Sequence, residues 1–358
     1  MRLGLNLGYW GAGNDSANLA LAQEADRLGY DVVWVAEAYG SDAATVLSWI
    51  AAQTQRVDVG SAIFQIPGRS PAMTAMTAAT LDTLSGGRFR LGIGVSGPQV
   101  SEGWHGVRFD APLGRTREYI EIVRLALSRQ RVKYDGKHYT LPLPDGPGKA
   151  LHLTVHPVRE HIPIYLAALG PKNLELCGEI SDGWLSIFTS ASHLEDSLSV
   201  LRAGRARRAE PAAGDKSLDG FDVVANCGVV LGDDSQADLE AAANPLRPQA
   251  ALYIGGMGSR ERNFYNEYAQ RLGYTAEAKV IQDLYLAKDY DGAMAAVPFG
   301  FLDDTALLGS VDRISDRLQE YADAGVTTMT ISPAASSQEE RLTAIRAVAA
   351  AFDKSGVG

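Results

Sequence analysis

Short apolar segments of strand length alternate with longer segments of helical periodicity, and this alternation limits the possible folds more than any other feature of the sequence. The strand-like segments are continuous apolar runs, which is typical of parallel strands buried on both faces. Eight strands are predicted, at Leu3–Leu7, Val32–Ala36, Val57–Phe64, Phe89–Val95, Ile164–Leu169, Gly183–Phe188, Asp222–Leu231 and Thr327–Ser332.

The order of these strands and helices predicts an α/β fold, a (β/α)8 TIM barrel that forms one domain over residues 1–358. We expect insertions after the fourth and seventh strands, because those intervals are longer than a barrel requires. Residues 96–106 are expected to form a loop, 136–157 an irregular insertion and 235–294 an interrupted helical segment. A doubly wound open sheet is the alternative fold. In a barrel, the functional site lies at the carboxyl ends of the strands.

The fifth predicted strand turns into a helix through Gly170-Pro171-Lys172-Asn173. Such a turn presents free backbone N–H groups at a helix N-terminus, where the helix dipole also favours an anion. Glycine permits close approach to the backbone, and Lys172 adds a positive charge. We interpret the turn as a phosphate-binding cradle. The alternative is an ordinary strand-to-helix turn with proline in the first helical turn.

The chain carries 33 Lys and Arg against 43 Asp and Glu, a net charge of −10, which argues against a nucleic-acid surface. Its two cysteines, Cys177 and Cys227, lie in apolar runs and form neither a disulfide framework nor a metal motif. No stretch is long and apolar enough to span a bilayer, and the first strand pattern starts next to Met1. We therefore expect a soluble cytoplasmic protein with no metal, membrane or nucleic-acid partner.

Three stretches resemble one family: Trp34–Asp42, Leu84–Gln99 and Ala167–Trp184. The resemblance is to the luciferase-like monooxygenase superfamily, and within it to oxidoreductases that depend on the deazaflavin coenzyme F420. The Gly-Val-Ser-Gly-Pro-Gln run at 94–99 is also similar to methylenetetrahydromethanopterin reductase.

This resemblance implies that a deazaflavin lies across the barrel mouth. It implies a non-prolyl cis peptide behind the ring, contacts from an acid that ends strand two, and contacts from the end of strand four to the pyrimidine edge. The residues that match these cofactor-binding positions are Glu37, Ala62, Ile63, Val95, Ser96, Leu169, Gly170, Lys172 and Asn173. Lys172 and Arg69 are candidates for a basic rim facing the polyglutamate tail of the coenzyme.

A deazaflavin transfers a hydride, so the protein must position the reactants and supply at most one proton donor. The catalytic candidates are Glu102, Glu37 and His105. For Glu37 the alternative is a pair with a helix end or a basic neighbour, and a lone loop histidine such as His105 can simply be solvated. Three aromatic residues are candidates for the wall of the substrate pocket, with a place in the core as the alternative: Trp10, Tyr39 and Trp104. Tyr9 lies in a loop expected near the barrel mouth.

The predicted activity is hydride transfer between C5 of coenzyme F420 and a small organic substrate of unsaturated or carbonyl type. Two alternatives remain open: an FMN-dependent monooxygenase of the same superfamily, and a non-catalytic flavin-binding barrel. Family members commonly dimerise, so a homodimer is expected.

Overall fold

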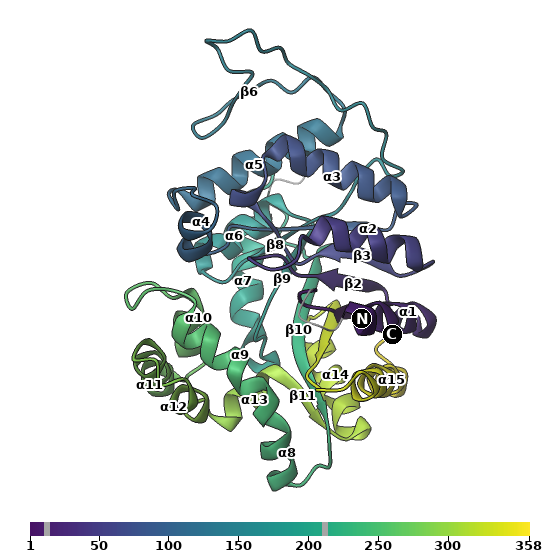
Figure 1. The fold of residues 1–358 in the computed structure, drawn as a ribbon, viewed down its shortest axis with the longest axis vertical. Coiled ribbons are helices and arrows are strands. Elements are labelled where there is room, and N and C mark those ends of the chain that lie inside the picture. The colour runs from purple at the N-terminus through teal and green to yellow at the C-terminus, as the bar shows by residue number, and fades with distance from the viewer. Residues whose placement is uncertain (11–14, 210–213) are drawn as a thin grey trace.

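Eight parallel strands close into a barrel in the computed structural model, which describes residues 1–10, 15–209 and 214–358 (Figure 1). The strands in order are β1 (Arg2–Asn6), β2 (Val32–Val35), β3 (Asp58–Ser61), β5 (Phe89–Gly94), β8 (Ile164–Ala167), β9 (Gly183–Leu185), β10 (Asp222–Leu231) and β12 (Thr328–Pro333). Each pairs in parallel with the next, and β12 pairs back onto β1. The TIM barrel is confirmed, and the closed ring rules out the doubly wound open sheet.

Helices surround the barrel and bury one face each against the strands. They are α1 (Asp15–Leu28), α2 (Ala43–Gln53), α3 (Pro71–Leu84), α5 (Pro112–Leu127), α6 (Pro171–Ile180), α7 (Leu194–Arg205), α14 (Val311–Ala324) and α15 (Gln338–Ser355). Several begin at a side-chain cap, as at Asp42 before α2 and Ser70 before α3. The two ends of the chain meet beside α1 and α15, where the Met1 amino group donates to the Val357 carbonyl (Figure 1).

The first insertion follows β5 and comprises α4 (Pro98–Gly103), then α5, and a hairpin of β6 (Tyr134–Asp135) and β7 (Thr140–Leu141) that extends beyond α5 and α3 (Figure 1). The prediction of a loop at 96–106 is wrong, because α4 lies within it. Pro98 suits the first turn of a helix, and burial of Val100 and Ser101 holds the short helix in place.

The second insertion follows β10 and packs around a hydrophobic cluster of its own. Its helices are α8 (Gln236–Ala243), α9 (Arg247–Ala251), the π-helical turn η4 (Leu252–Gly256), α10 (Phe264–Arg271), α11 (Thr275–Leu286), α12 (Tyr290–Ala295) and α13 (Phe299–Thr305). Short 3-10 turns are η1 (Ile66–Gly68), η2 (Ala191–His193) and η3 (Asn244–Leu246).

Besides the short hairpin strands β6 and β7, the sequence prediction missed β11 (Ala306–Gly309), which pairs with the carboxyl half of β10, outside the eight-stranded ring. Its four residues directly follow α13, so no turn signal separates them from a helical region. Only the long β10 partner, which extends past the barrel, turns this short apolar run into a strand.

The third predicted strand is divided by a bulge. Strand β3 ends at Ser61, the Ala62–Ile63 bond is cis as the resemblance implied, and β4 (Phe64–Gln65) resumes pairing with β5. A Cβ at Gly92 would lie 1.9 Å from the Ser61 carbonyl oxygen, and one at Gly94 would lie 2.6 Å from Ile63 Cδ1. The two glycines of β5 therefore provide the space in which this bulge lies.

Candidate active site

The turn from β8 into α6 is open, as a ligand-binding corner must be. Gly170 is the N-cap of α6, makes no side-chain cap and has a φ of −76°, which any residue could adopt. A Cβ at Gly170 would meet no atom within 4 Å, whereas one at Gly92 or Gly94 would collide with the bulge. Glycine at this position thus leaves room beside the helix N-terminus rather than serving the backbone conformation.

Polar groups beside this corner are left with unused hydrogen-bonding capacity. Lys172 is exposed and has no ion pair within the described part of the chain. Asn173 donates from Nδ2 to the Ala167 carbonyl at 3.3 Å, while its Oδ1 is buried without a partner among the described residues. The corner therefore has the composition and the room that an anionic group would need.

Arg271 adds a second cation to the corner. It lies at the end of α10 and donates from Nη2 to the Leu169 carbonyl oxygen at 3.0 Å, across 102 positions of sequence. Sequence reasoning missed Arg271 because nothing in its helix distinguishes it from a solvated surface arginine. Only the folding of the second insertion onto the barrel brings it here.

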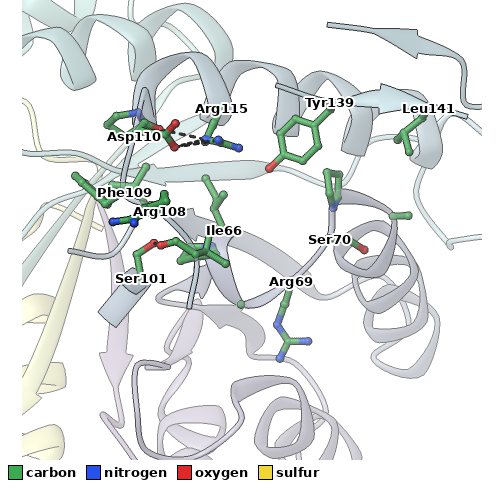
Figure 2. A pocket seen from close by; sticks show the side chains of 17 residues that line it. Ile66, Arg69, Ser70, Ser101, Arg108, Phe109, Asp110, Arg115, Tyr139 and Leu141 are labelled. Atoms are coloured by element: carbon green, nitrogen blue, oxygen red, sulfur yellow. Dashed lines mark hydrogen bonds and ion pairs between the residues drawn. The ribbon is translucent and has the colours of Figure 1, made fainter. Parts of the chain in front are cut away.

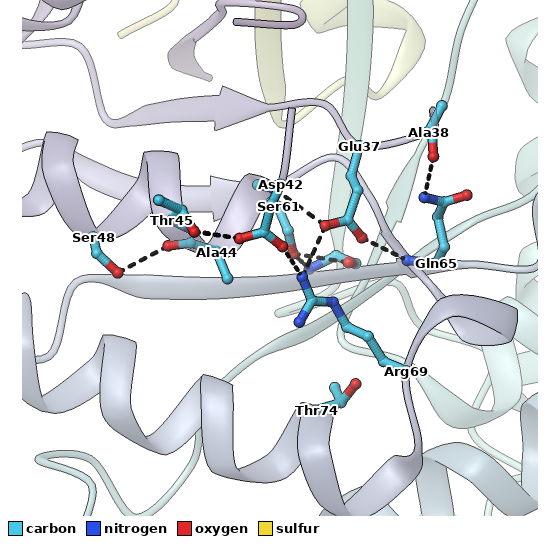
Figure 3. Close-up of polar contacts among 12 residues, drawn as sticks. Glu37, Ala38, Asp42, Ala44, Thr45, Ser48, Ser61, Gln65, Arg69 and Thr74 are labelled. Atoms are coloured by element: carbon cyan, nitrogen blue, oxygen red, sulfur yellow. Dashed lines mark hydrogen bonds and ion pairs between the residues drawn. The ribbon is translucent and has the colours of Figure 1, made fainter. Parts of the chain in front are cut away.

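Glu37, at the end of β2, lies in a partly buried ion cluster of the protein itself (Figure 3). Its Oε1 accepts from Arg69 Nη2 at 2.8 Å and from the Ala43 N–H at 3.2 Å, and its Oε2 accepts from the Gln65 N–H at 3.4 Å. Arg69 also pairs with Asp42, and the Glu37 and Arg69 side chains are only 10% and 12% exposed. The alternative reading of Glu37, a pair with a helix end and a basic neighbour, is therefore present in the structure.

The cluster also perturbs its own members. Burial lowers the pKa of Arg69, but the hydrogen bond and charge of Glu37 outweigh it, so that the pKa is raised. Burial raises the pKa of Asp42, and hydrogen bonds from Thr45 together with the charge of Arg69 bring it below its ordinary value. Arg69 is thus a partner of two carboxylates rather than a free charge on a basic rim.

Gln65 joins three segments of the barrel mouth and was not singled out from the sequence. The buried amide donates from Nε2 to the Ala38 carbonyl at 2.7 Å, and its Oε1 accepts from Ser96 Oγ at 3.1 Å. The His105 Nε2 lies 3.4 Å from the same oxygen. Glu37, Ser96 and His105 are therefore brought together around Gln65, as a site at the strand ends requires.

Two residues other than glycine adopt positive φ at the ends of barrel strands. Ser96, which follows β5, has a φ of 57°, and Phe188, which follows β9, has a φ of 53°. Such conformations are sparsely populated for these residue types and concentrate at functional sites. Their position at the barrel mouth agrees with the predicted contact of Val95 and Ser96 with a ligand.

Glu102, the remaining catalytic candidate, is not joined to this group. It lies on α4, is exposed to solvent and accepts a hydrogen bond from the Phe109 N–H at 3.0 Å. Its recorded contact is local, so Glu102 organises the loop after α4. Trp104 on the same segment is 65% exposed, and its place in a pocket wall remains a prediction.

Aromatic side chains of the second insertion meet residues from the barrel ends. The ring of Tyr253, on the π-helical turn, lies 4.7 Å from that of Tyr265 and 5.7 Å from that of Phe188. Burial raises the pKa of Tyr265 to about 12, so this phenol stays neutral. The insertion therefore adds aromatic side chains at the barrel mouth that were not among the predicted wall residues Trp10, Tyr39 and Trp104.

Both cysteines are buried thiols. Burial raises the pKa of Cys177 to about 12 and that of Cys227 to about 11, which disfavours the reactive thiolate. Within the described ranges, no group of three or more His, Cys, Asp and Glu side chains could hold a metal ion. Over the same part of the chain, no helix combines the length and the apolar character that crossing a bilayer requires.

The model of the luciferase-like monooxygenase family matches residues 10–328. The chain belongs to this family. A Mycobacterium tuberculosis protein named "Putative coenzyme F420-dependent oxidoreductase" is 43% identical over 350 residues, which cover 96% of this chain and 99% of the relative. The 5,10-methylenetetrahydromethanopterin reductase of Archaeoglobus fulgidus is 30% identical over 85% of each chain. The family recognised from the sequence is therefore confirmed.

Two solved structures share the fold. The coenzyme F420-dependent tetrahydromethanopterin reductase of Methanopyrus kandleri superimposes with a TM-score of 0.78 at 24% identity, covering 97% of both chains. An F420-dependent secondary alcohol dehydrogenase, solved with an F420-acetone adduct, gives a TM-score of 0.74 at 17% identity, covering 97% of this chain and 98% of the other.

Proposed function

We propose that the protein is an F420-dependent oxidoreductase that transfers a hydride between C5 of the deazaflavin and a small organic substrate of unsaturated or carbonyl type. The observation that carries the proposal is the open corner at Gly170, flanked by Lys172 and Arg271. The cofactor and enzyme class are supported by the relative at 43% identity, whose name contains both, and by the related reductases.

The residues fit a phosphate-bearing cofactor whose ring lies over the barrel. Leu169, Gly170, Lys172 and Asn173 would hold the phosphate, with Arg271 as a further cation. The Ala62–Ile63 bulge and the Val95–Ser96 strand end would bound the ring. When bound, the deazaflavin supplies or accepts the hydride at C5; the chain itself positions the two reactants.

Among the three catalytic candidates, we assign the proton exchange with substrate to His105. Glu37 is committed to Arg69, and Glu102 faces solvent. The imidazole carries ring nitrogens that can donate or accept a proton, and its Nε2 lies 3.4 Å from Gln65 Oε1 at the barrel mouth. Glu37 then acts as a positioning residue that fixes the loops after β2 and β4.

The test is a titration of purified protein with coenzyme F420 followed by coenzyme fluorescence, with FMN as competitor. We expect saturable quenching with micromolar affinity and no displacement by FMN. Tight FMN binding with oxygen consumption by reduced FMN would instead identify a monooxygenase, and failure to bind either would identify a non-catalytic barrel. The expected homodimer is tested separately by light scattering, in which a monomer mass would contradict it.

A further inference from the structure

A cavity lies beside the barrel mouth, and none of the residues that line it belongs to the Gly170 corner. It has a volume of about 500 Å³ and lies between the start of α3, the segment after α4, the start of α5 and the β7 strand (Figure 2). Val95, at the end of β5, lines it and connects it to the predicted ring contact. A cavity of this size can enclose a small organic molecule.

The walls of this cavity are mainly apolar. Its apolar lining side chains include Ile66, Pro67, Val95, Val107, Phe109 and Leu141. Such walls favour a hydrocarbon or aromatic body over a strongly hydrated chain, because burial of polar groups without partners is costly.

The charged lining residues have the opposite balance from the whole chain. The cavity is lined by one acid, Asp110, and by three arginines, Arg69, Arg108 and Arg115. In the whole chain, by contrast, acidic residues outnumber basic ones 43 to 33. Arg69 is committed to Glu37 and Asp42, and Figure 2 shows its side chain turned away from the other two arginines. The positive charge available to a ligand therefore comes from Arg108 and Arg115.

Arg115 pairs with Asp110 but still has N–H donors that are free to bind a ligand. Its Nε and Nη2 contact Asp110 Oδ1 at 3.0 and 2.9 Å, and no partner of Nη1 is recorded within the described residues. Arg108, which is exposed, makes no hydrogen bond or ion pair within that same part of the chain. Tyr139 adds a hydroxyl that points toward Arg115 (Figure 2).

We propose that this cavity binds the substrate as an organic carboxylate: an apolar body against the walls, and a carboxylate on Arg115 with Arg108 and the Tyr139 hydroxyl beside it. This inference rests on the proposed function, because the ligand is a substrate only if the protein catalyses hydride transfer. It narrows the substrate class to apolar carboxylic acids that carry a reducible or oxidisable carbon. The carboxylate of the coenzyme tail has the same chemistry, but it belongs to a hydrated peptide chain that the apolar walls do not suit.

The probes are 2-naphthoate and 2-naphthalenemethanol, which share an apolar body and differ in charge; binding is measured by calorimetry with and without coenzyme. We expect the wild type to bind the carboxylate about tenfold more tightly than the alcohol, because a charged hydrogen bond is gained. Arg115→Gln should abolish this preference. Arg260→Gln, which breaks an exposed Arg–Asp pair elsewhere, should retain it. Val107→Trp, at a 37% exposed lining position, should weaken both probes.

Equal affinity of the wild type for the two probes, or binding that neither Arg115→Gln nor Val107→Trp changes, would overturn the proposal. A loss of coenzyme affinity in Arg115→Gln would assign the cavity to the coenzyme tail and would overturn it as well. Because the probes are titrated without coenzyme too, these results are independent of whether the protein binds F420.

Discussion

Two regions of the barrel mouth differ in whether their charged groups are already paired within the protein. At the corner between β8 and α6, the space beside Gly170 is open and Lys172 and Asn173 keep unused hydrogen-bonding capacity. At the ends of β2 and β4, the partly buried Glu37 and Arg69 pair with each other, and of their buried polar atoms only Arg69 Nε lacks a partner among the described residues. The carboxylates and the guanidinium of the cluster neutralise each other without a ligand, whereas the cations of the open corner would gain from binding an anion. On the proposed function, the open corner would bind the cofactor and the ion-paired cluster would position the strand ends.

Filling the open corner should have the largest effect. Leucine can adopt the backbone conformation of Gly170, so Gly170→Leu should fold normally and place its side chain where the ligand phosphate would lie. We expect coenzyme affinity to fall by at least about 100-fold, or roughly 2.8 kcal/mol, in a fluorescence titration. Gly146→Leu, at an exposed loop glycine with comparable space, is the matched control. Unchanged affinity in Gly170→Leu would remove the corner from the cofactor site.

Reversing the charge at the corner should have the next largest effect. Lys172→Glu should weaken coenzyme binding by about 10- to 100-fold, because a charged hydrogen bond is replaced by repulsion. Added salt should reduce the difference in coenzyme affinity between the wild type and Lys172→Glu, because it screens the charges. Lys149→Glu changes the net charge equally at an exposed loop position and should leave the affinity unchanged. Equal losses in both variants would mean that only the overall charge matters.

Breaking the closed cluster should lower stability rather than binding. Glu37→Gln removes the charge that faces buried Arg69, and we expect a loss of about 1 to 2 kcal/mol in the free energy of unfolding from urea titration. Glu102→Gln, at the exposed acid on α4, should change stability by less than about 0.5 kcal/mol. If Glu37→Gln keeps its stability but loses coenzyme affinity, Glu37 contacts the ring, and the contrast between the two regions fails.

The smallest expected effect is the pH dependence of the stability that Asp42, at the edge of the cluster, contributes. The pKa of Asp42 is lowered, so its contribution to stability is complete above its unfolded value of 3.8 and disappears as pH falls through the lower folded pKa. Asp42→Asn keeps a good N-cap for α2 while removing the charge. The unfolding free energies of wild type and variant should therefore differ at about pH 6 and converge toward about pH 3. A difference that is constant over this range would show that the charge of Asp42 is not involved.

Much of the fold could be read along the chain, because buried parallel strands leave continuous apolar runs. The prediction of β10 matches the structure residue for residue, and most other strands differ by one to a few residues at their ends. The errors are local. Helix α4 depends on a few buried contacts, and strand β11 depends on a partner strand some 80 positions earlier in the sequence. Neither contact leaves a periodic pattern in a short segment.

The sequence by itself determined the barrel, the family and the turn at Gly170, because each is encoded in neighbouring residues whose periodicity or backbone chemistry is local. Only the tertiary structure decided that Arg69 faces Glu37, that Gln65 joins Ser96 and His105, and that Arg271 reaches Leu169. The two residues of each pair lie 31 to 102 positions apart in the sequence. Side chains that meet across a barrel mouth are brought together by strand order and loop packing, which no single stretch of sequence contains.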